Sequence, residues 1–197
     1  MKVLFATTNP AKVKRYATKL QERGIEVLTL KDIDIKINVE ETGKNAIENA
    51  YLKAKAYYDA TGIITIGVDD NLFIEELSEE KQPGTNVRRV NGKELTDEEM
   101  IKYYSGLAKE NGGKLTAKWV YGMVVFNGKE PKQYTWSKDQ FYFVDKPHEK
   151  RHTGYPLDSI SIMPELNKYF VELTPEDKKQ KGKDENHVID FIVKSLV

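Results

Sequence analysis

The first thirty residues alternate between apolar runs and a helical pattern, and this order limits the possible folds more than any other feature. Val3 to Ala6 is a short apolar run that ends in the polar segment Thr7-Thr8-Asn9-Pro10. A helical spacing of apolar residues starts at Ala11 and stops at Gly24, and Glu26 to Leu30 returns to a strand pattern. Strand, loop, helix and strand in this order are typical of an α/β unit.

The middle of the chain continues the mixed pattern. It predicts a long helix from Thr42 to a stop at Gly62, then a buried strand from Ile63 to Val68. A short apolar segment, Leu72 to Leu77, and an exposed loop over 78–93 come next. Thr96 and the acidic residues after it match a capping box, which predicts a helix through about residue 108.

The second half of the chain is richer in strands. Asn127-Gly128 between two β-rich runs, Leu115–Phe126 and Gln133–Phe143, is a strong hairpin signal. A polar loop is expected over 145–159, and two helices follow, one from Thr174-Pro175 and a last amphipathic one. We therefore predict an α/β fold over residues 1–197, a single domain of two lobes with a mixed β-sheet flanked by helices.

The composition excludes several classes of protein. Lys plus Arg and Asp plus Glu both number 31, so neither nucleic acid nor an anionic membrane surface is an expected partner. No apolar run approaches the roughly 18 residues of a membrane span, and Val3 to Ala6 is too short for a signal peptide. Without cysteine there are no disulfides and no thiolate metal sites. We expect a cytoplasmic enzyme or binding protein.

The segment between the first strand and the first helix is a candidate anion site. A loop that leads from a buried strand into a helix leaves backbone N–H groups unpaired, and the helix dipole adds partial positive charge there. The hydroxyls of Thr7 and Thr8 and the Asn9 amide add donors, and Lys12 lies about one turn into the helix. An ordinary N-cap with a surface lysine explains the same residues, and the glycines of a Walker motif are missing.

Carboxylates follow the middle strand. Asp69 and Asp70 come directly after it, where open α/β sheets place ligands. Two adjacent carboxylates beside a phosphate need a cation, and Mg²⁺ prefers hard oxygen ligands. If the strand continues, the two side chains point to opposite sides and have different roles. Glu41, Glu48 and Asn49, around the start of the expected helix, can converge on the same cleft. A turn at the Asp pair, and a favourable helix dipole at Glu41, remain structural alternatives.

Taken together, several segments resemble the inosine triphosphate pyrophosphatase family. Residues 6–12 are similar to its opening A-T-G-N-x-x-K segment, and residues 40–50 to its E-E-T-G-x-x-x-x-E-N-A segment at matching spacing. Residues 68–71 resemble its A-D-D-S-G turn, residues 83–92 its P-G-x-x-S-A-R-Y-x-G loop, and residues 154–158 its G-F-G-Y-D-P segment. His187 falls where the terminal S-H-R of the family lies. The segments keep the family's order and distances over nearly the whole chain.

The resemblance implies a Mg²⁺-dependent pyrophosphatase that splits a non-canonical nucleoside triphosphate of the ITP, dITP or XTP class into monophosphate and pyrophosphate. It also implies a central cleft between two α/β lobes, and a homodimer. The residues it assigns to the triphosphate are Thr7, Thr8, Asn9 and Lys12. Those it assigns to metal and catalysis are Glu41, Asp69, Asp70 as the general base, and Lys12. Lys53 and Arg89 bear on phosphate or on the shape of the cleft, and Tyr155, Asp158 and His187 on the base.

This sequence departs from the family pattern at several of these positions. Arg15 stands where the family usually has glutamate, and Asn71-Leu72 replaces Ser-Gly after the Asp pair. Leu157 replaces an aromatic residue. Val188 replaces the arginine expected to help recognise the keto edge of the purine, and a site without a fixed hydrogen-bond partner discriminates poorly between bases. The phosphate and metal half of the site is therefore better matched than the base half.

These departures leave alternatives open. The altered base half favours a pyrophosphatase for a modified pyrimidine nucleotide, as in the related septum-inhibition protein family. Arg15 and the altered Asp turn favour a nucleotide-binding homologue without turnover. Tyr155 can also be an ordinary loop aromatic, and His187 a packing or capping residue of the last helix. The C-terminal lysines, Lys181 and Lys183 among them, are either a solvated face or the source of the family's lysine.

Overall fold

The computed structural model describes residues 1–180 and 185–196, without the side chains of 11 and 178–180. Its contacts divide the chain into two compact units. The first comprises 1–70, 120–136 and the described part of 184–197, and the second 71–119 and 137–183. Two long strands, β3 (Thr65–Ile74) and β6 (Lys114–Phe126), contribute residues to both. Lys181 and Lys183 lie outside the described residues.

The strands of the first unit form the predicted strand–loop–helix–strand arrangement. β1 (Lys2–Phe5) pairs in parallel with β2 (Glu26–Leu28) on one side and with β3 on the other. α1 (Pro10–Glu22) connects β1 to β2, and Gly24 follows it with a φ of 73°. β6 is next to β3 in the strand order, and β7 (Lys132–Ser137) pairs with β6.

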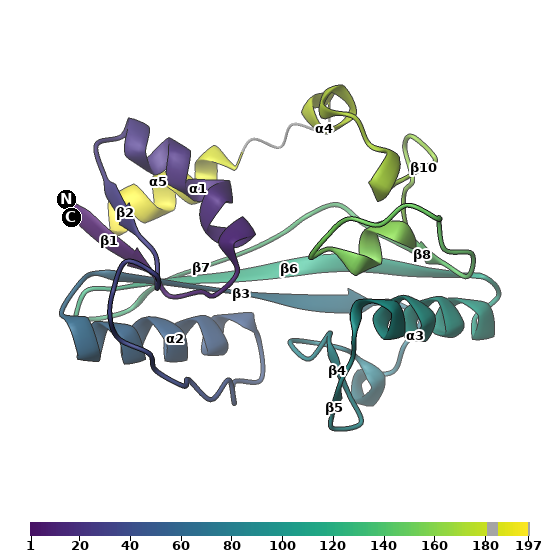
Figure 1. The fold of residues 1–197 in the computed structure, drawn as a ribbon, viewed down its shortest axis with the longest axis horizontal. Coiled ribbons are helices and arrows are strands. Elements are labelled where there is room, and N and C mark those ends of the chain that lie inside the picture. The colour runs from purple at the N-terminus through teal and green to yellow at the C-terminus, as the bar shows by residue number, and fades with distance from the viewer. Residues whose placement is uncertain (181–184, 197) are drawn as a thin grey trace. The chain divides into compact units, whose positions relative to one another are not determined.

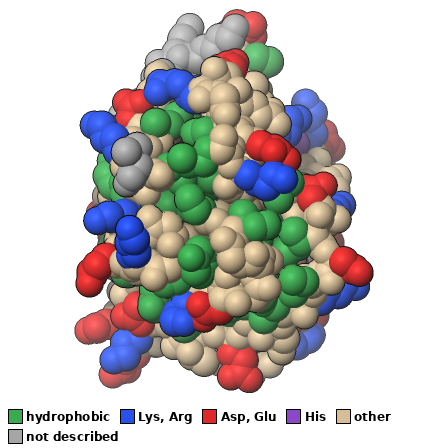
Figure 2. Space-filling view, turned by 90° about the vertical axis from the view of Figure 1, so that its left-hand side faces the viewer, with side chains coloured by type: hydrophobic (Ala, Val, Ile, Leu, Met, Phe, Trp, Pro, Cys, Tyr) green, Lys and Arg blue, Asp and Glu red, His purple; other side chains and the backbone are tan. Residues whose placement is uncertain are grey.

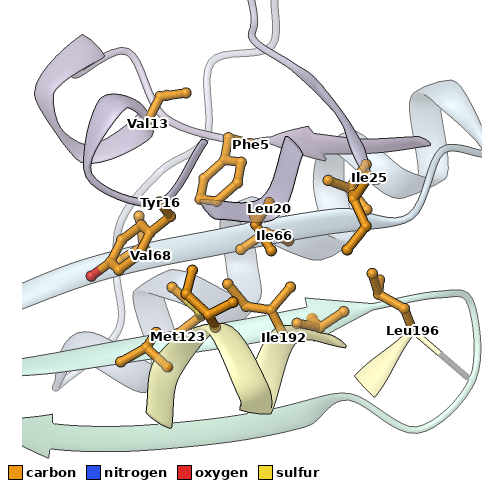
Figure 3. Close-up of a cluster of buried hydrophobic side chains, with 14 residues drawn as sticks. Phe5, Val13, Tyr16, Leu20, Ile25, Ile66, Val68, Met123, Ile192 and Leu196 are labelled. Carbon is orange, nitrogen blue, oxygen red and sulfur yellow. The ribbon is translucent and has the colours of Figure 1, made fainter. Parts of the chain in front are cut away.

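Helices cover both sides of these strands. α1 and α5 (Asn186–Ser195) lie on one side, and α2 (Ala46–Thr61) lies on the other (Figure 1). Because successive strand residues point to opposite faces, Ile66 and Val68 of β3 pack towards α1 and α5. Figure 3 shows this cluster, in which Tyr16 of α1 and Ile192 of α5 meet the strands. The apolar side predicted for the last helix is confirmed at this position.

The α2 backbone lies directly against two strands, and glycine makes this contact possible. A Cβ atom on Gly67 of β3 would lie 1.9 Å from the carbonyl oxygen of Ala50. On Gly122 of β6, it would lie 2.6 Å from the carbonyl carbon of Ala46. The missing side chains let α2 approach closely enough to place its polar residues Asn49 and Lys53 beside Asp69, inside β3.

Gly67→Ala tests this close approach. Overpacking of a tight contact typically costs 1–3 kcal/mol, so we expect the free energy of unfolding to fall by about 2 kcal/mol in urea titrations. Gly106→Ala in α3 is the matched control, because nothing lies within 4 Å of a Cβ atom there. This second change should stabilise the protein by roughly 0.5–1 kcal/mol through helix propensity. If the urea midpoints of Gly67→Ala and the unmodified protein were equal, α2 would not lie as close to Gly67 as described.

The second unit is built on antiparallel strands. β8 (Phe141–Val144) pairs with Lys114–Ala117 of β6, β9 (Ser161–Met163) with β8, and β10 (Lys168–Tyr169) with β9. The other elements of this unit are β4 (Arg89–Val90), β5 (Lys93–Glu94), α3 (Asp97–Glu110), α4 (Pro175–Gln180) and the 3₁₀ turns η1 (Glu79–Lys81), η2 (Pro156–Ser159) and η3 (Phe170–Glu172). With parallel pairs in the first unit, the sheet is mixed, and the predicted α/β class is confirmed.

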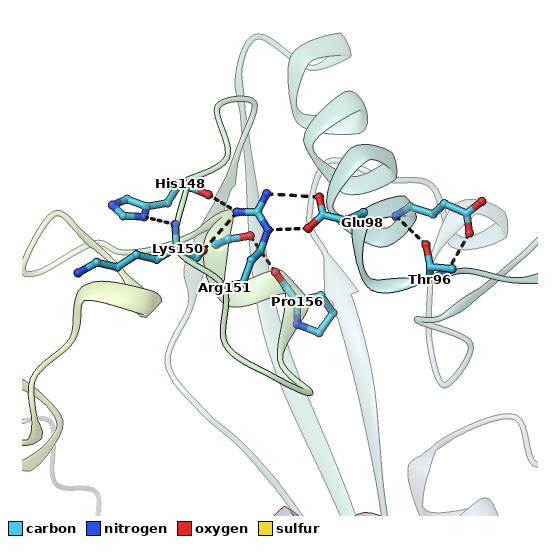
Figure 4. Close-up of polar contacts among 8 residues, drawn as sticks. Thr96, Glu98, His148, Lys150, Arg151 and Pro156 are labelled. Carbon is cyan, nitrogen blue, oxygen red and sulfur yellow. Dashed lines mark hydrogen bonds and ion pairs between the residues drawn. The ribbon is translucent and has the colours of Figure 1, made fainter.

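Polar contacts fix the start of α3 and the loop beside it. The predicted capping box is present, since Thr96 accepts a hydrogen bond from the Glu99 N–H and donates its own N–H to the Glu99 carboxylate. Hydrogen bonds from Lys93 and from the Thr96 backbone lower the pKa of Glu99 to about 2. Arg151 of the 145–159 loop donates to Glu98 of α3 at 2.7 Å (Figure 4). The loop is thereby anchored to the helix.

Two predicted boundaries are wrong. The long helix begins at Ala46 rather than at Thr42, because Asn45 is the N-cap and accepts a hydrogen bond from the Glu48 N–H at 3.0 Å. The Asp69-Asp70 pair does not end a strand or form a turn. It lies inside β3, which runs on through the apolar segment predicted as a separate element.

Two other predictions need partial correction. The hairpin at Asn127-Gly128 is present, but the second run splits into β7 and β8 at residues 138–140, and the two strands pair with different parts of β6. The exposed loop over 78–93 contains η1 and part of the β4–β5 hairpin. Short strands with few apolar residues give little periodicity, which is why the sequence does not reveal them.

The surface agrees with the even charge balance. On the face shown in Figure 2, basic and acidic side chains alternate around a band of hydrophobic ones. Within residues 1–180 and 185–196, no helix has both the length and the apolar character that a membrane span requires.

Candidate functional site

The alternation along β3 separates the two adjacent carboxylates. Asp70 shares the face of Ile66 and Val68, towards α1, whereas Asp69 shares the face of Gly67, towards α2. Asp69 is only 8% exposed, and the Asp70 side chain is 27% exposed. The conditional prediction that the two would point to opposite sides is confirmed, because the strand continues through them.

Lys12 links the first helix to both carboxylates. Its Nζ lies 3.0 Å from Asp70 Oδ2 and 3.6 Å from Asp69 Oδ1. The lysine is in the first turn of α1, directly after the Thr7–Asn9 loop. The loop and the strand therefore meet at this ammonium group.

Lys53 extends the cluster to the segment before α2. Its Nζ lies 3.2 Å from Asp69 Oδ1 and 3.4 Å from Glu41 Oε1. Lys53 is nearly buried, whereas the Glu41 side chain is 47% exposed. Glu41, Asp69 and Asp70 with Lys12 and Lys53 form what we call the acidic cluster, whose formal charge is −1 (three carboxylates and two ammonium groups). Such a cluster favours an added cation.

Asn49, one of the residues expected to converge on this cleft, holds the cluster together. It is 1% exposed, its Nδ2 donates to Asp69 Oδ2 at 3.1 Å, and its Oδ1 accepts from the Gly43 N–H at 2.7 Å. It thus fixes the Glu41–Gly43 segment against β3. An asparagine within the apolar stripe of α2 was the signal in the sequence, because a buried amide needs partners.

Asn49→Ala should loosen this arrangement. It removes one hydrogen bond to a carboxylate and one to a backbone N–H, so we expect a fall of about 2–4 kcal/mol in the free energy of unfolding. Asn127→Ala at the exposed hairpin turn is a control for asparagine loss. Urea denaturation measures both, and an Asn49→Ala midpoint equal to that of the unmodified protein would show that these bonds contribute little.

The predicted phosphate loop is short and open to solvent. Thr8 and Asn9 are exposed, the Asn9 N–H donates to Thr7 Oγ1 at 3.2 Å, and α1 starts at Pro10. The Lys12 N–H bonds back to the Asn9 carbonyl at 3.1 Å. The loop therefore stands at the N-terminus of α1 beside the acidic cluster, in a position where backbone N–H groups and the helix dipole favour an anion.

Three of the remaining predicted residues belong to the other unit. Arg89, Tyr155 and Asp158 belong to the second unit and make their contacts there. Arg89 pairs with Glu94 across the β4–β5 hairpin, Tyr155 is 48% exposed, and Asp158 contacts His152 Nδ1 at 2.9 Å. The roles assigned to these three residues stay predictions.

His187 stands in the first unit at the start of α5. Its ring is 5.8 Å from that of Tyr134 and 6.5 Å from that of Trp136, both on β7. Tyr121 of β6 stacks on Trp136 at 5.3 Å, and Tyr134 stacks on Phe191 at 5.0 Å. His187 thus packs at the edge of an aromatic group, and its predicted contact with the base stays a prediction.

Arg15, the residue that departs most from the family pattern, is paired. Its Nε and Nη2 donate to the two carboxylate oxygens of Glu185, and its guanidinium lies 4.7 Å from the centre of the Tyr121 ring. Burial is the largest single influence and lowers the pKa of Arg15, but the hydrogen bond with Glu185 and the charges of Tyr16, Tyr121 and Glu185 together raise it. Burial raises the pKa of Tyr121 to about 12, against the influence of Arg15. The arginine is therefore held as a cation.

No ready-made metal cage exists in the described part of the chain, where no three His, Cys, Asp or Glu side chains gather closely enough to hold an ion. This donor set still fits magnesium. Mg²⁺ is usually bound through one or two carboxylates, several waters and substrate phosphates rather than by an all-protein cage. Asp70 and Glu41 have the exposure that this requires.

The comparison with known families now decides the identity. The model of the Ham1 family matches residues 3–183, a span that contains the phosphate loop, α2 and the acidic cluster. The chain belongs to the Ham1 family. This match confirms the resemblance found in the sequence segments, and it ends before α5, where His187 and Val188 lie.

Similar proteins of known sequence and structure agree with the Ham1 assignment. The chain is 32% identical over 188 residues to a dITP/XTP pyrophosphatase of Aquifex aeolicus, with 91% of this chain and 89% of the relative covered. A dITP/XTP pyrophosphatase of Bacillus subtilis is 30% identical over 181 residues, with coverages of 90% and 88%. The solved structure of a Ham1 protein from Coxiella burnetii aligns with a TM-score of 0.80 at 21% identity over 100% of both chains. These structures share the fold.

Proposed function

We propose that this chain is an enzyme that hydrolyses a non-canonical nucleoside triphosphate of the ITP, dITP or XTP class to a monophosphate and pyrophosphate. The observation that carries the proposal is the acidic cluster beside the Thr7–Asn9 loop, where Lys12 Nζ stands 3.0 Å from Asp70. The names of the relatives from A. aeolicus and B. subtilis support both the reaction and the substrate class.

Different residues of the first unit have separate roles in this reaction. Backbone N–H groups at the start of α1 and the ammonium of Lys12 bind the phosphates. Asp70, the more exposed of the two aspartates, orients a water for in-line attack on the phosphoanhydride and takes its proton. Asp69 is engaged by Asn49, Lys12 and Lys53, and its main role is to keep the lysines in place. The water oxygen bonds to one of the two phosphorus atoms of the anhydride between the α- and β-phosphates. The bond from that phosphorus to the bridging oxygen breaks, and the other phosphate group leaves with this oxygen.

Magnesium belongs to the proposal as the cofactor. Glu41 and Asp70 would hold it, with Asp69 as a further carboxylate behind them. When bound, it neutralises charge on the phosphate oxygens and increases the acidity of a coordinated water. Lys12 and Lys53 would hold the carboxylates together while the ion is absent, because each ammonium group contacts two of them. The homodimer, the cleft between lobes and the cytoplasmic location stay predictions.

The test is a panel of triphosphates. Purified protein is incubated with ITP, XTP, ATP, GTP, dUTP and a modified pyrimidine triphosphate, with Mg²⁺ or with EDTA, and pyrophosphate is measured. We expect release from ITP and XTP with Mg²⁺, and its loss with EDTA. Release only from a pyrimidine triphosphate would shift the substrate class, and binding of ITP without any release would indicate a homologue that has lost turnover.

Lys12→Ala tests the phosphate contact. A charged hydrogen bond to phosphate contributes about 1.5–3 kcal/mol, so the Kd for inorganic tripolyphosphate should rise roughly 10- to 100-fold in calorimetry. The Kd for inosine itself should stay within about twofold, because the nucleoside has no phosphate to contact Lys12. Lys14→Ala, on the exposed side of α1, serves as the control. Equal effects on tripolyphosphate and inosine would place the phosphates elsewhere.

A further inference from the structure

We propose that Arg15 reads the nucleobase, with Glu185 as its positioning residue, and selects 6-oxopurines over adenine. This inference rests on the proposed function for the location of the phosphates. It assigns base selection to two residues outside the segments that resemble the family's base site. It also accounts for two departures from the family pattern, the arginine at position 15 and the loss of the arginine at position 188.

The position of Arg15 fits a base whose phosphates lie at Lys12. Arg15 follows Lys12 by three residues, so the two stand on the same side of α1, one about 5 Å further along the helix. Lys12 contacts Asp70, and Tyr121, over which the Arg15 guanidinium lies, is on β6 in the same unit. A nucleotide held at Lys12 and lying along α1 brings its base to Arg15.

The guanidinium is fixed and still has donors for a ligand. Of the five N–H donors of arginine, Glu185 accepts one at Nε and one at Nη2. The donors that remain can serve other acceptors, the Tyr121 hydroxyl included. The Arg15 side chain is 24% exposed, which is enough for a ligand to reach it. Because the guanidinium is planar and already held by Glu185, the side chain loses little conformational entropy when a ligand binds.

The aromatic residues around the Arg15 guanidinium bring hydrogen-bond donors, beside the Glu185 carboxylate that already accepts from it. Three buried side-chain groups lack a hydrogen-bond partner within the described residues, and two of them are donors of the first unit: the hydroxyl of Tyr16, a residue that is 1% exposed, and the indole N–H of Trp136. The third is Asn71 Oδ1, in the second unit. Buried groups of this kind usually have a partner. Trp136 also stacks on Tyr121, which places aromatic rings beside the guanidinium for a base to contact. A ligand edge that carries acceptors would fit here.

The edge of a 6-oxopurine meets this requirement. Its O6 and N7 are both acceptors and match a guanidinium fork, whereas adenine presents an amino donor at position 6. Val188, where the family pattern has arginine, is fully buried in the core and has no side-chain donor that could contact a base. The chain therefore carries its arginine on α1 and a glutamate ahead of α5, with the two charges bonded to each other.

The test compares ITP with ATP in Arg15→Gln. We expect the ratio of kcat/KM for ITP over ATP to fall roughly 10- to 100-fold, since a site built for a hydrogen bond rejects the analogue that cannot form it. Glu185→Gln should lower the ratio less, and Arg15→Lys, which keeps the charge but loses the fork, should not restore it. An unchanged ratio, or an equal loss on both substrates, would overturn the inference.

Two controls separate this inference from its alternatives. Arg23→Gln removes the exposed pair with Asp190 and so weakens another contact with α5, from the residue that follows α1. It should leave the ratio unchanged, so a fall in the ratio there would assign the effect to helix docking. If the unmodified protein hydrolyses none of the triphosphates, the proposed function fails. Calorimetry with IMP and AMP then decides on Arg15, because loss of IMP preference in Arg15→Gln supports its role and an unchanged preference refutes it.

Discussion

Asp70→Asn should reduce pyrophosphate release by about 10²- to 10⁴-fold while the protein stays folded. The asparagine side chain has nearly the same volume but cannot take a proton from water, and loss of a general base typically has an effect of this size. Asp70 is partly exposed and its ion pair with Lys12 lies at the edge of the core, so the melting temperature should change little. Steady-state kinetics with ITP and a thermal melt measure both quantities.

The matched control for Asp70→Asn is Asp59→Asn on α2, an exposed aspartate that pairs with the lysine one turn before it. Its kinetics should equal those of the unmodified protein. If Asp70→Asn kept more than about a tenth of the activity, Asp70 would lose its role as the base. In that case Glu41 would be the next residue to test.

Lys53→Met should lower the free energy of unfolding by about 3–5 kcal/mol. Lys53 and Asp69 are both about 11% exposed in their side chains, and removing one member of a buried ion pair leaves the other charge uncompensated. Asp69 keeps Lys12 and Asn49 as partners, so we expect the lower end of this range. Activity should fall as well, because Glu41 and Asp69 lose the cation that holds them together.

Lys55→Met on the same helix provides the control for Lys53→Met. Lys55 is exposed and pairs with Asp59 across one turn of α2. Its replacement should leave the urea midpoint unchanged. A Lys53→Met midpoint as high as that of Lys55→Met would mean that the buried contacts of the acidic cluster contribute nothing to the fold.

The elements with strong local signals were predictable from the sequence. The apolar run of β1, the stop at Gly24 and the capping box at Thr96 each follow from short-range chemistry, and all three are present. The sequence misplaces the start of α2 because Thr42 and Asn45 are both good N-caps, and the hydrogen bond from the Gly43 N–H to the Asn49 side chain favours the second. A local pattern does not contain that contact.

The site was predictable only in part, for the same reason. The phosphate loop and the Asp pair are contiguous segments that a family pattern preserves. The contacts of Asn49 and the pair between Arg15 and Glu185 join residues far apart in the chain, and these depend on how α2 and α5 pack. The Asp pair itself was assigned to a strand end because carboxylates inside a buried strand are rare unless they are partnered, as Asp69 is here.

The central claim is that polyphosphate and a divalent cation meet between the start of α1 and the acidic cluster. Paramagnetic relaxation with Mn²⁺ in place of Mg²⁺ tests this most directly, in the presence of an inosine triphosphate analogue with an α,β-imido bridge. We expect the amide signals of Asn9, Gly43 and Asp70 to broaden first, and only when both metal and nucleotide are present. Sharp signals at these three residues together with broadening elsewhere would contradict it.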